Sequence, residues 1–372
     1  MRTKETHPSL RYHLMGVLLI CVLSITVYSN TLNSPFVLDD AQNIQDNAFI
    51  RLAHLNFKKL YDAAFKSPAS KRPVANITFA LNYYFGRYEV TGYHVVNIII
   101  HMINGILVYF LALSLFHQAG SISNQRTLEL PDRTIPLVAL FASLVFVAHP
   151  LQTQSVTYIV QRMNSLATLF YLLSLWLYIR ARLTERRWQR WSLFSGCLLS
   201  WAMALGSKQI AVTLPFVVLL YEWYFVQDLS RPWLKRNIAY LFIPMVLLGV
   251  FAIIYLNGHP LARILGTYKT REFTLVERVW TQFSVVVFYI SLLFFPHPSR
   301  LNLAHQFPVS HSLLEPVTTL FSLITIITLM GLAVCLAKKS RLISFSILWF
   351  LINLEIWARL FLDKKGTSDF TQ

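Results

Sequence analysis

The sequence predicts an all-α protein that crosses a membrane several times, and three observations support this prediction. The 372 residues are 55% hydrophobic and only 13% charged, whereas about 25% of the residues in soluble domains are charged. The mean hydropathy is +0.50. The apolar residues also form blocks of about 20 residues, the length that an α-helix needs to cross a bilayer. These features are typical of a polytopic helical membrane protein.

Charge and cysteine content exclude other classes of protein. A net charge of +16 would indicate nucleic-acid binding in a soluble protein. Here Lys and Arg gather in short loops between apolar blocks, which is the pattern that orients membrane helices. We therefore expect no nucleic acid as a partner. Cys21, Cys197 and Cys335 all fall inside apolar blocks, so they are expected to be small core residues rather than disulfides or metal ligands.

Helical blocks follow one another along the chain. They are expected at 12–32, 92–116, 135–150, 164–180, 191–207, 210–226, 237–256, 279–296, 317–337 and 342–358. The first block is longer than the apolar core of a signal peptide, and no cleavage site stands out after it. It is therefore expected to be a retained membrane helix.

The basic loops give the orientation of these helices. A basic N-terminus and the basic run at 180–190 are expected inside, which places the large loop 33–91 outside. The inside–outside alternation of the basic loops fails near the basic residues 338–341. These residues would lie outside if both 279–296 and 317–337 crossed the membrane, and inside only if 279–296 does not cross fully. We favour that interpretation, because irregular backbone is tolerated at membrane depth where it lines a protein cavity.

The outer loop contains two apolar segments that are too short to span the membrane. Apolar residues recur at helical spacing over 57–65, with lysines around them, and this pattern predicts an amphipathic helix lying on the membrane surface. The stretch 74–85 is only a dozen residues long, so it is expected to be interfacial.

A polar stripe runs along the predicted helix 92–116. His94, Asn97, His101 and Asn104 lie on one helical face. Such a stripe either makes hydrogen bonds between helices or lines a cavity, and the sequence leaves both interpretations open. With no Cys or carboxylate on that face, a metal site is not expected.

Two further polar groups fall at the outer ends of predicted helices. The segment 148–162 contains His149, Gln152 and Arg162 near a helix-ending proline. Lys208 stands alone between two apolar blocks, where it either extends to the interface or has a functional role. A polar loop is the simplest interpretation of 148–162, but a compact and largely uncharged segment also suits the wall of a site.

Ionisable residues therefore gather at the outer boundary of the membrane: Asp39, Asp40, Arg72, His94, His149, Arg162 and Lys208. A transporter would place such groups near the midplane, within repeated broken helices. The pattern instead favours an enzyme that acts at the interface on a lipid-linked anionic substrate. Basic groups would hold its phosphate, and a carboxylate would take a proton from an acceptor hydroxyl.

Four motifs closely resemble one known family. They read FVLDD…IQDN (36–47), KRPVANITFALNYYFG…GYHVVNIIIHMIN (71–104), HPLQTQSVTYIVQRMNSLATLFYLLSLWLY (149–178) and SKQIAVTLPFVVLLYEW (207–223). In this order they resemble the transmembrane-and-tetratricopeptide-repeat O-mannosyltransferase-like family, part of the GT-C superfamily of polyprenyl-phosphate-sugar-dependent glycosyltransferases. The similarity covers residues 12–353. It implies a GT-C-like transmembrane domain over 1–358, whose outer loop 33–91 carries the acidic pair.

The resemblance also implies a reaction and roles for the residues. A membrane enzyme of this family transfers mannose or another hexose, with inversion, from a polyprenyl-phosphate sugar to a hydroxyl group of a protein Ser/Thr or a glycan. It uses no metal and no cofactor beyond this lipid-linked donor. Asp39 corresponds to the general base, and Asp40 positions the base or the acceptor. The donor phosphate or the site wall is assigned to Arg72, His94, His149, Arg162 and Lys208, and the site is lined by Asn97, His101 and Gln152.

The chain departs from the family pattern at two places. Gln209 stands where an acid commonly follows the lysine, and the sequence diverges after Asn353. The divergent tail 359–372 and the lack of repeats predict a C-terminally truncated family member. The alternatives are a catalytically degenerate relative with a non-enzymatic membrane role and, less favoured, a transporter of lipid-linked substrates. We expect an integral protein of the bacterial inner membrane rather than the endoplasmic reticulum, with an extracytoplasmic active face.

Overall fold

The structure is a computed structural model that describes residues 10–121, 134–237, 273–301 and 308–354, together with Val246 and Val250. All regular elements in these ranges are helices, so the predicted all-α class is confirmed. Six of the helices are long and apolar enough to cross a membrane, and one bent pair is a seventh candidate. The predicted polytopic architecture is therefore confirmed as well. The chain forms two compact units, Met1–Leu214 and Pro215–Gln372.

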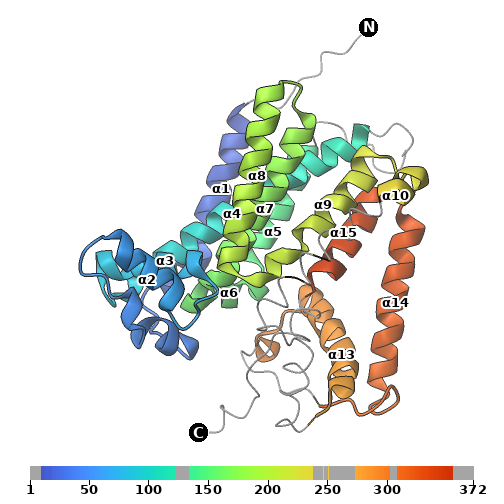
Figure 1. Cartoon of the computed structure of the whole chain (residues 1–372). Coiled ribbons are helices and arrows are strands. Elements are labelled where there is room, and N and C mark those ends of the chain that lie inside the picture. The colour runs from blue at the N-terminus through green and yellow to red at the C-terminus, as the bar shows by residue number, and fades with distance from the viewer. Residues whose placement is uncertain are drawn as a thin grey trace. The chain divides into compact units, whose positions relative to one another are not determined.

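The first unit is a bundle of long helices. Its members are α1 (Leu10–Tyr28), α4 (Val90–Ser121), α5 (Ile135–Ala148), α7 (Arg162–Leu183) and α8 (Arg187–Ser207). Helix α4 packs against α1, α5 and α7, and α7 packs against α8 (Figure 1). Helix α5 ends before Pro150, because the residue that precedes a proline is driven out of the helical region. His149 is accordingly extended, with ψ of 129°.

Close packing at one glycine brings three of these helices together. A Cβ atom on Gly105 of α4 would lie 2.5 Å from Val147 of α5 and 2.9 Å from Ile20 of α1. The Ser143 hydroxyl on α5 also donates a hydrogen bond to the Gly105 carbonyl, at 2.7 Å. Small residues allow this close approach of helix backbones, which is how membrane helices associate when water is absent.

The predicted outer loop folds into short helices at one end of this bundle (Figure 1). They are η2 (Ala41–Gln45), η3 (Ala48–Ile50), α2 (Phe57–Lys66) and α3 (Pro73–Gly86). Asn56 caps the start of α2, because its side chain accepts a hydrogen bond from the Lys58 amide at 2.8 Å. It exposes Phe57, Tyr61 and Phe65 and buries two alanines. The amphipathic helix predicted at 57–65 is thus present, and its position on a membrane surface stays a prediction.

The second unit contains the remaining helices. They are α9 (Leu214–Tyr221), which starts at the unit boundary, η7 (Glu222–Val226), α10 (Arg231–Asn237), α13 (Leu275–Phe294), α14 (Thr318–Leu336) and α15 (Arg341–Asn353). Arg341 donates a hydrogen bond to the Tyr224 carbonyl, at 2.7 Å, and forms an ion pair with Asp228. The basic residues 338–341 therefore lie at the same end of this unit as the turn after η7. Most of the predicted helix 237–256 and all of the tail 359–372 lie outside the described residues.

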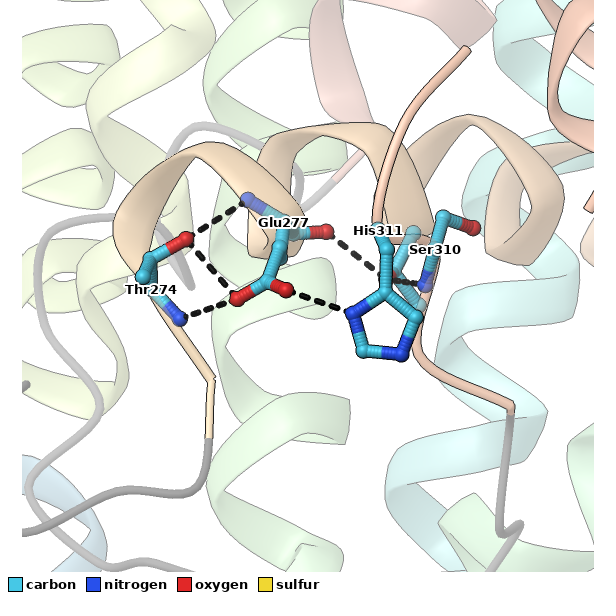
Figure 2. A network of polar contacts seen from close by, with 5 residues as sticks. Thr274, Glu277, Ser310 and His311 are labelled. Carbon is cyan, nitrogen blue, oxygen red and sulfur yellow. Dashed lines mark hydrogen bonds and ion pairs between the residues drawn. The ribbon is translucent and has the colours of Figure 1, made fainter. Parts of the chain in front are cut away.

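A polar network joins the start of α13 to the segment before α14 (Figure 2). The Glu277 carboxylate is 2.6 Å from His311 Nδ1, and the Ser310 amide donates to the Thr281 hydroxyl at 2.9 Å. The Thr319 hydroxyl in turn donates to the Ser310 hydroxyl. The start of α13 and the segment just before α14 are thus joined by hydrogen bonds. Helix α13 is among the helices long and apolar enough to cross a membrane, so the expectation that 279–296 does not cross fully stays a prediction.

The Glu277–His311 pair generates a pH prediction. The hydrogen bond that His311 donates to the Glu277 carboxylate raises the pKa of His311, and the charge of Glu315 acts in the same direction. The pair therefore stabilises the folded state at pH values below the ordinary histidine pKa of about 6.5. This stabilisation is lost as the pH rises through the raised pKa of His311. Glu277→Gln should lower the pKa of His311, measured by NMR titration of labelled histidine in detergent. Glu315→Gln should lower it less, and an unchanged pKa in Glu277→Gln would contradict the assignment.

Candidate active site

The predicted site residues lie at one end of the first unit. Helices α1, α5 and α8 end there, and α4 and α7 begin there. Hydrogen bonds join these ends, since Tyr28 of α1 donates to the Val147 carbonyl of α5 and His94 of α4 bonds to the carbonyl of Ser34. The helix ends are joined by η4 (Pro150–Gln152), α6 (Thr153–Thr157) and η5 (Ile159–Gln161), and after α8 by η6 (Gln209–Thr213).

Asp40 is a buried anchor for the loop that carries the acidic pair. It is fully buried, and its Oδ2 accepts a hydrogen bond from the Val37 amide at 3.0 Å. Its Oδ1 accepts from the Val160 amide at 2.7 Å. These bonds tie the loop to the segment just before α7. Burial raises the pKa of Asp40 to about 6, against the lowering effect of the two amides.

Asp39 has the opposite environment from its neighbour. Its side chain is exposed, while its amide donates a hydrogen bond to the Tyr158 hydroxyl at 2.8 Å. Its carbonyl accepts from Asn43 Nδ2, also at 2.8 Å. The preceding Leu38 has φ of 47°, in the left-handed region that costs a non-glycine residue about 1 kcal/mol. The backbone of Asp39 is therefore fixed and its carboxylate is left accessible, an arrangement suited to a base.

Arg162 is the most enclosed charge in this region, with 0% of its surface exposed. Its Nε donates to the Asn97 side chain at 2.7 Å, Nη2 donates to the Tyr93 carbonyl at 2.9 Å, and Nη1 donates to the Asn82 side chain. The guanidinium also lies 4.8 Å from the centre of the Phe79 ring. Sequence reasoning assigned phosphate binding to Arg162. Its enclosure by α3 and α4 indicates a structural role instead, because no accessible edge faces a substrate.

The polar stripe of α4 makes hydrogen bonds between segments. Asn97 donates to the carbonyl of Val156, at 3.1 Å, and His101 bonds to that of Val147, at 3.1 Å. Asn104 donates to the carbonyl of Ser165, also at 3.1 Å. Together with His94, these side chains are almost fully buried. Of the two interpretations left open by the sequence, the structure has helix–helix bonding, so direct substrate contact by His94, Asn97 or His101 is not supported.

Two cationic residues come from segments that pack together. Arg72 lies at the start of α3, with its Nη1 2.8 Å from the Met163 sulfur of α7. Lys208 follows α8, and a Cβ atom on the nearby Gly206 would lie 2.9 Å from the Val74 side chain of α3. Both cations are half-buried. The end of α8 and the start of α3 therefore meet, and this contact brings a lysine and an arginine into one neighbourhood.

The two remaining predicted residues have local partners. His149 is half-buried, and its Nδ1 accepts a hydrogen bond from the Leu151 amide at 3.2 Å, which caps η4. The Gln152 amide donates to the His149 carbonyl at 2.9 Å. The structure thus places both at the corner between α5 and α6. No group of three or more His, Cys, Asp or Glu side chains able to hold a metal ion occurs in the described ranges, and the predicted metal-free mechanism stays a prediction.

Tyr158 was missed by sequence reasoning, although it lies within a motif that the sequence singled out. Its hydroxyl accepts the hydrogen bond from the Asp39 amide. A buried tyrosine usually finds a partner for its hydroxyl, but nothing in the sequence indicates that the partner is 119 residues away. Together with the Val160 amide, Tyr158 fixes the acidic pair on the segment before α7.

These features define a class of protein: a polytopic helical membrane protein with an exposed carboxylate and two cationic side chains at one end of its helices. Comparison with known proteins agrees with this class. Residues 134–255 match the family model described as dolichyl-phosphate-mannose-protein mannosyltransferase. No solved structure matches the chain.

The chain is also similar to several curated proteins. The chain is 28% identical over 234 residues to Protein O-mannosyl-transferase Tmtc3 of Drosophila melanogaster, covering 59% of this chain and 25% of that protein. It is 31% identical over 174 residues to Protein O-mannosyl-transferase F38B6.6 of Caenorhabditis elegans, covering 45% of this chain and 23% of that protein. It is 27% identical over 236 residues to Protein O-mannosyl-transferase TMTC4 of Homo sapiens, covering 59% of this chain and 31% of that protein. The predicted resemblance is confirmed: the chain is similar to proteins named protein O-mannosyl-transferases. The matched part spans only about a quarter to a third of their length.

The enclosure of Arg162 generates a stability prediction. Arg162→Met should lower the free energy of unfolding by about 3 kcal/mol or more, because it leaves several buried acceptors without their donor. The exposed Arg187 is the matched control, and Arg187→Met should change stability by no more than about 0.5 kcal/mol. Unfolding of both variants in detergent measures the difference. Equal stability of the two would rule out the structural role of Arg162.

The buried carboxylate of Asp40 generates a second prediction. Its pKa of about 6 in the folded state exceeds the ordinary aspartate value of 3.8, so between these two pH values the folded state binds a proton more tightly than the unfolded state does. This contribution to stability is present below pH 4 and is lost as the pH rises to about 6, a loss of about 3 kcal/mol. Asp40→Asn should remove this dependence, measured by unfolding from pH 4 to 7.5. The exposed Asp46 is the control, and a variant Asp46→Asn that also removed the dependence would count against Asp40.

Proposed function

We propose that the chain is a membrane glycosyltransferase that transfers mannose from a polyprenyl-phosphate sugar to a Ser or Thr hydroxyl group of a protein. The observation that carries this proposal is the contrast between the two acids. Asp40 is buried and holds the loop, while Asp39 is exposed on a fixed backbone. The names of the relatives, all protein O-mannosyl-transferases, support the sugar and the acceptor.

In the proposed reaction Asp39 is the general base. Its carboxylate accepts the proton of the acceptor hydroxyl as the hydroxyl oxygen bonds to the anomeric carbon of the sugar. The bond from that carbon to the phosphate oxygen breaks, and its electron pair leaves with the polyprenyl phosphate. Attack on the face opposite the phosphate inverts the anomeric configuration. General base catalysis of this kind contributes about a hundredfold to ten-thousandfold in rate.

The donor phosphate is assigned to the neighbourhood of Arg72 and Lys208. Both side chains are half-buried and come from the contact between α3 and the end of α8. A guanidinium suits phosphate because its planar fork makes two parallel hydrogen bonds, and a lysine adds a compact charge. Arg162 and the stripe of α4 act in this scheme as the support that fixes the start of α7.

The proposed reaction takes place at the extracytoplasmic face. Support for this side comes from the basic residues at the opposite end of the bundle, where α7 ends at Arg180 and Arg182 and α8 begins, because such residues favour the cytoplasmic side. The curated relatives reported above come from animals. A bacterial inner membrane, expected from the sequence, therefore stays a prediction. The alternative is a degenerate relative that keeps the fold without turnover.

A transfer assay with matched variants tests the proposal. Asp39→Asn should reduce mannose transfer from polyprenyl-phosphate mannose to a Ser-containing peptide by about a hundredfold or more. Asp46→Asn is the control, since Asp46 is an exposed acid in the same loop and should transfer like the wild type. The wild-type protein is reconstituted in vesicles for the measurement.

Two outcomes would contradict parts of the proposal. Equal transfer by Asp39→Asn and wild type would exclude Asp39 as the base. No transfer by a folded wild-type protein, with the unfolding transition intact, would favour the degenerate alternative.

A further inference from the structure

A cleft with a volume of about 360 Å³ opens beside the acidic loop. It is lined by Phe36, Gln45, Arg51 and Tyr88 and is called here the Arg51 cleft. Phe36 precedes Asp39 by three residues, so their Cα atoms are at most about 11 Å apart. A peptide bound in the cleft could therefore extend to the proposed base, Asp39, within a few of its own residues.

The walls of the Arg51 cleft are held in place by bonds within the first unit. The Gln45 carbonyl accepts hydrogen bonds from Arg51 Nη2, at 2.7 Å, and from the Tyr88 hydroxyl, at 3.1 Å. The guanidinium lies 6.0 Å from the centre of the Tyr88 ring. Phe36 packs edge-on against Tyr93, with 5.4 Å between the ring centres. Side chains fixed in this way lose little conformational entropy when a ligand binds.

Arg51 has donors to spare for a ligand. It is exposed, and within the described part of the chain its guanidinium makes one hydrogen bond, although a guanidinium carries five N–H donors. Gln45 is also exposed. The nearby Arg87 is also exposed, donates to the Leu52 carbonyl and lies over the Tyr83 ring, but it is not one of the residues that line the cleft. Arg51 is thus an oriented and accessible cation, and it is the one that lines the cleft among the residues the structure describes.

The chemistry of the cleft fits a short acidic peptide. A guanidinium fork matches a carboxylate with two parallel hydrogen bonds. Two aromatic rings beside it provide apolar contact for a neighbouring side chain or for the peptide backbone. Asp46 follows Gln45 directly and is exposed, so a ligand with several negative charges would be repelled. A ligand with a single carboxylate pairs with the guanidinium and avoids the stronger repulsion from Asp46 that several negative charges would meet.

We propose that the Arg51 cleft binds the acceptor polypeptide through an Asp or Glu side chain located one to three residues from the hydroxyl that is modified. An extended chain advances about 3.3 Å per residue, so one to three residues span about 3 to 10 Å, comparable to the limit of about 11 Å between the Cα atoms of Phe36 and Asp39. This inference rests on the proposed function in one respect, namely that the acceptor is a Ser or Thr hydroxyl group of a polypeptide. Peptide binding itself requires no donor and no turnover.

Direct binding of two labelled peptides tests the inference. Both carry one Ser, and they differ only in an Asp or an Asn two residues away. Fluorescence polarisation with the full-length chain in detergent should show about fivefold tighter binding of the Asp peptide. Arg51→Gln should bring the affinity ratio close to one, and Arg51→Lys should keep part of the preference through its charge. Lys59→Gln is the control, because Lys59 is an exposed cation on α2 outside the cleft, and should keep the full ratio.

The outcomes separate this inference from the proposed function. Equal binding of the two peptides by the wild type, or an unchanged ratio in Arg51→Gln, would overturn the acidic-peptide site. A loss of affinity for polyprenyl-phosphate mannose in Arg51→Gln, with the peptide ratio retained, would also overturn it in favour of a donor contact. A peptide preference that depends on Arg51, in a wild type that transfers no sugar, supports the site and contradicts only the transferase.

Discussion

The candidate site depends on a buried guanidinium. Arg162 is the first residue of α7 and contacts α3 through Asn82 and α4 through Asn97. Removing a charge from water costs several kcal/mol, and only well-placed acceptors offset this cost. Side-chain and main-chain oxygens surround Arg162 on several sides, so the start of α7 has one favourable position. Val160 precedes Arg162 by two residues, and its amide donates the hydrogen bond to Asp40. Fixing the start of α7 therefore also fixes the donor that holds Asp40.

The adjacent acids divide two tasks that one carboxylate cannot perform together. A base must be accessible, whereas an anchor must be buried and hydrogen-bonded. Asp40 is the anchor, and its bonds to two amides hold the turn in which Leu38 adopts a left-handed conformation. Asp39 is thereby held by its backbone alone. Without an anchor beside it, an exposed loop carboxylate would sample many positions, and the near-attack geometry that catalysis requires would be rare.

Polar residues within the helices serve mainly to assemble the bundle. Apolar side chains gain little by leaving lipid for another apolar surface, so packing and hydrogen bonds hold membrane helices together. His101 and Asn97 each reach a carbonyl at the end of a neighbouring segment, where helical carbonyls lack their usual partners. The stripe on α4 therefore sets how α5, α6 and α7 end or begin around it. It thereby joins the helix ends at which the candidate site lies.

The sequence by itself determined the class of the protein, most of its helices and the end at which its ionisable residues gather. These depend on local properties: the length of apolar blocks, their flanking charges and the helical spacing of the stripe. It did not determine which ionisable residues are accessible. Asp39 and Asp40 are indistinguishable in FVLDD. The burial of Arg162 and the exposure of Arg51 depend on neighbours from distant segments. Burial and hydrogen-bond partners arise from contacts between residues up to 120 positions apart, so only the tertiary structure separates the anchors from the groups free to meet a substrate.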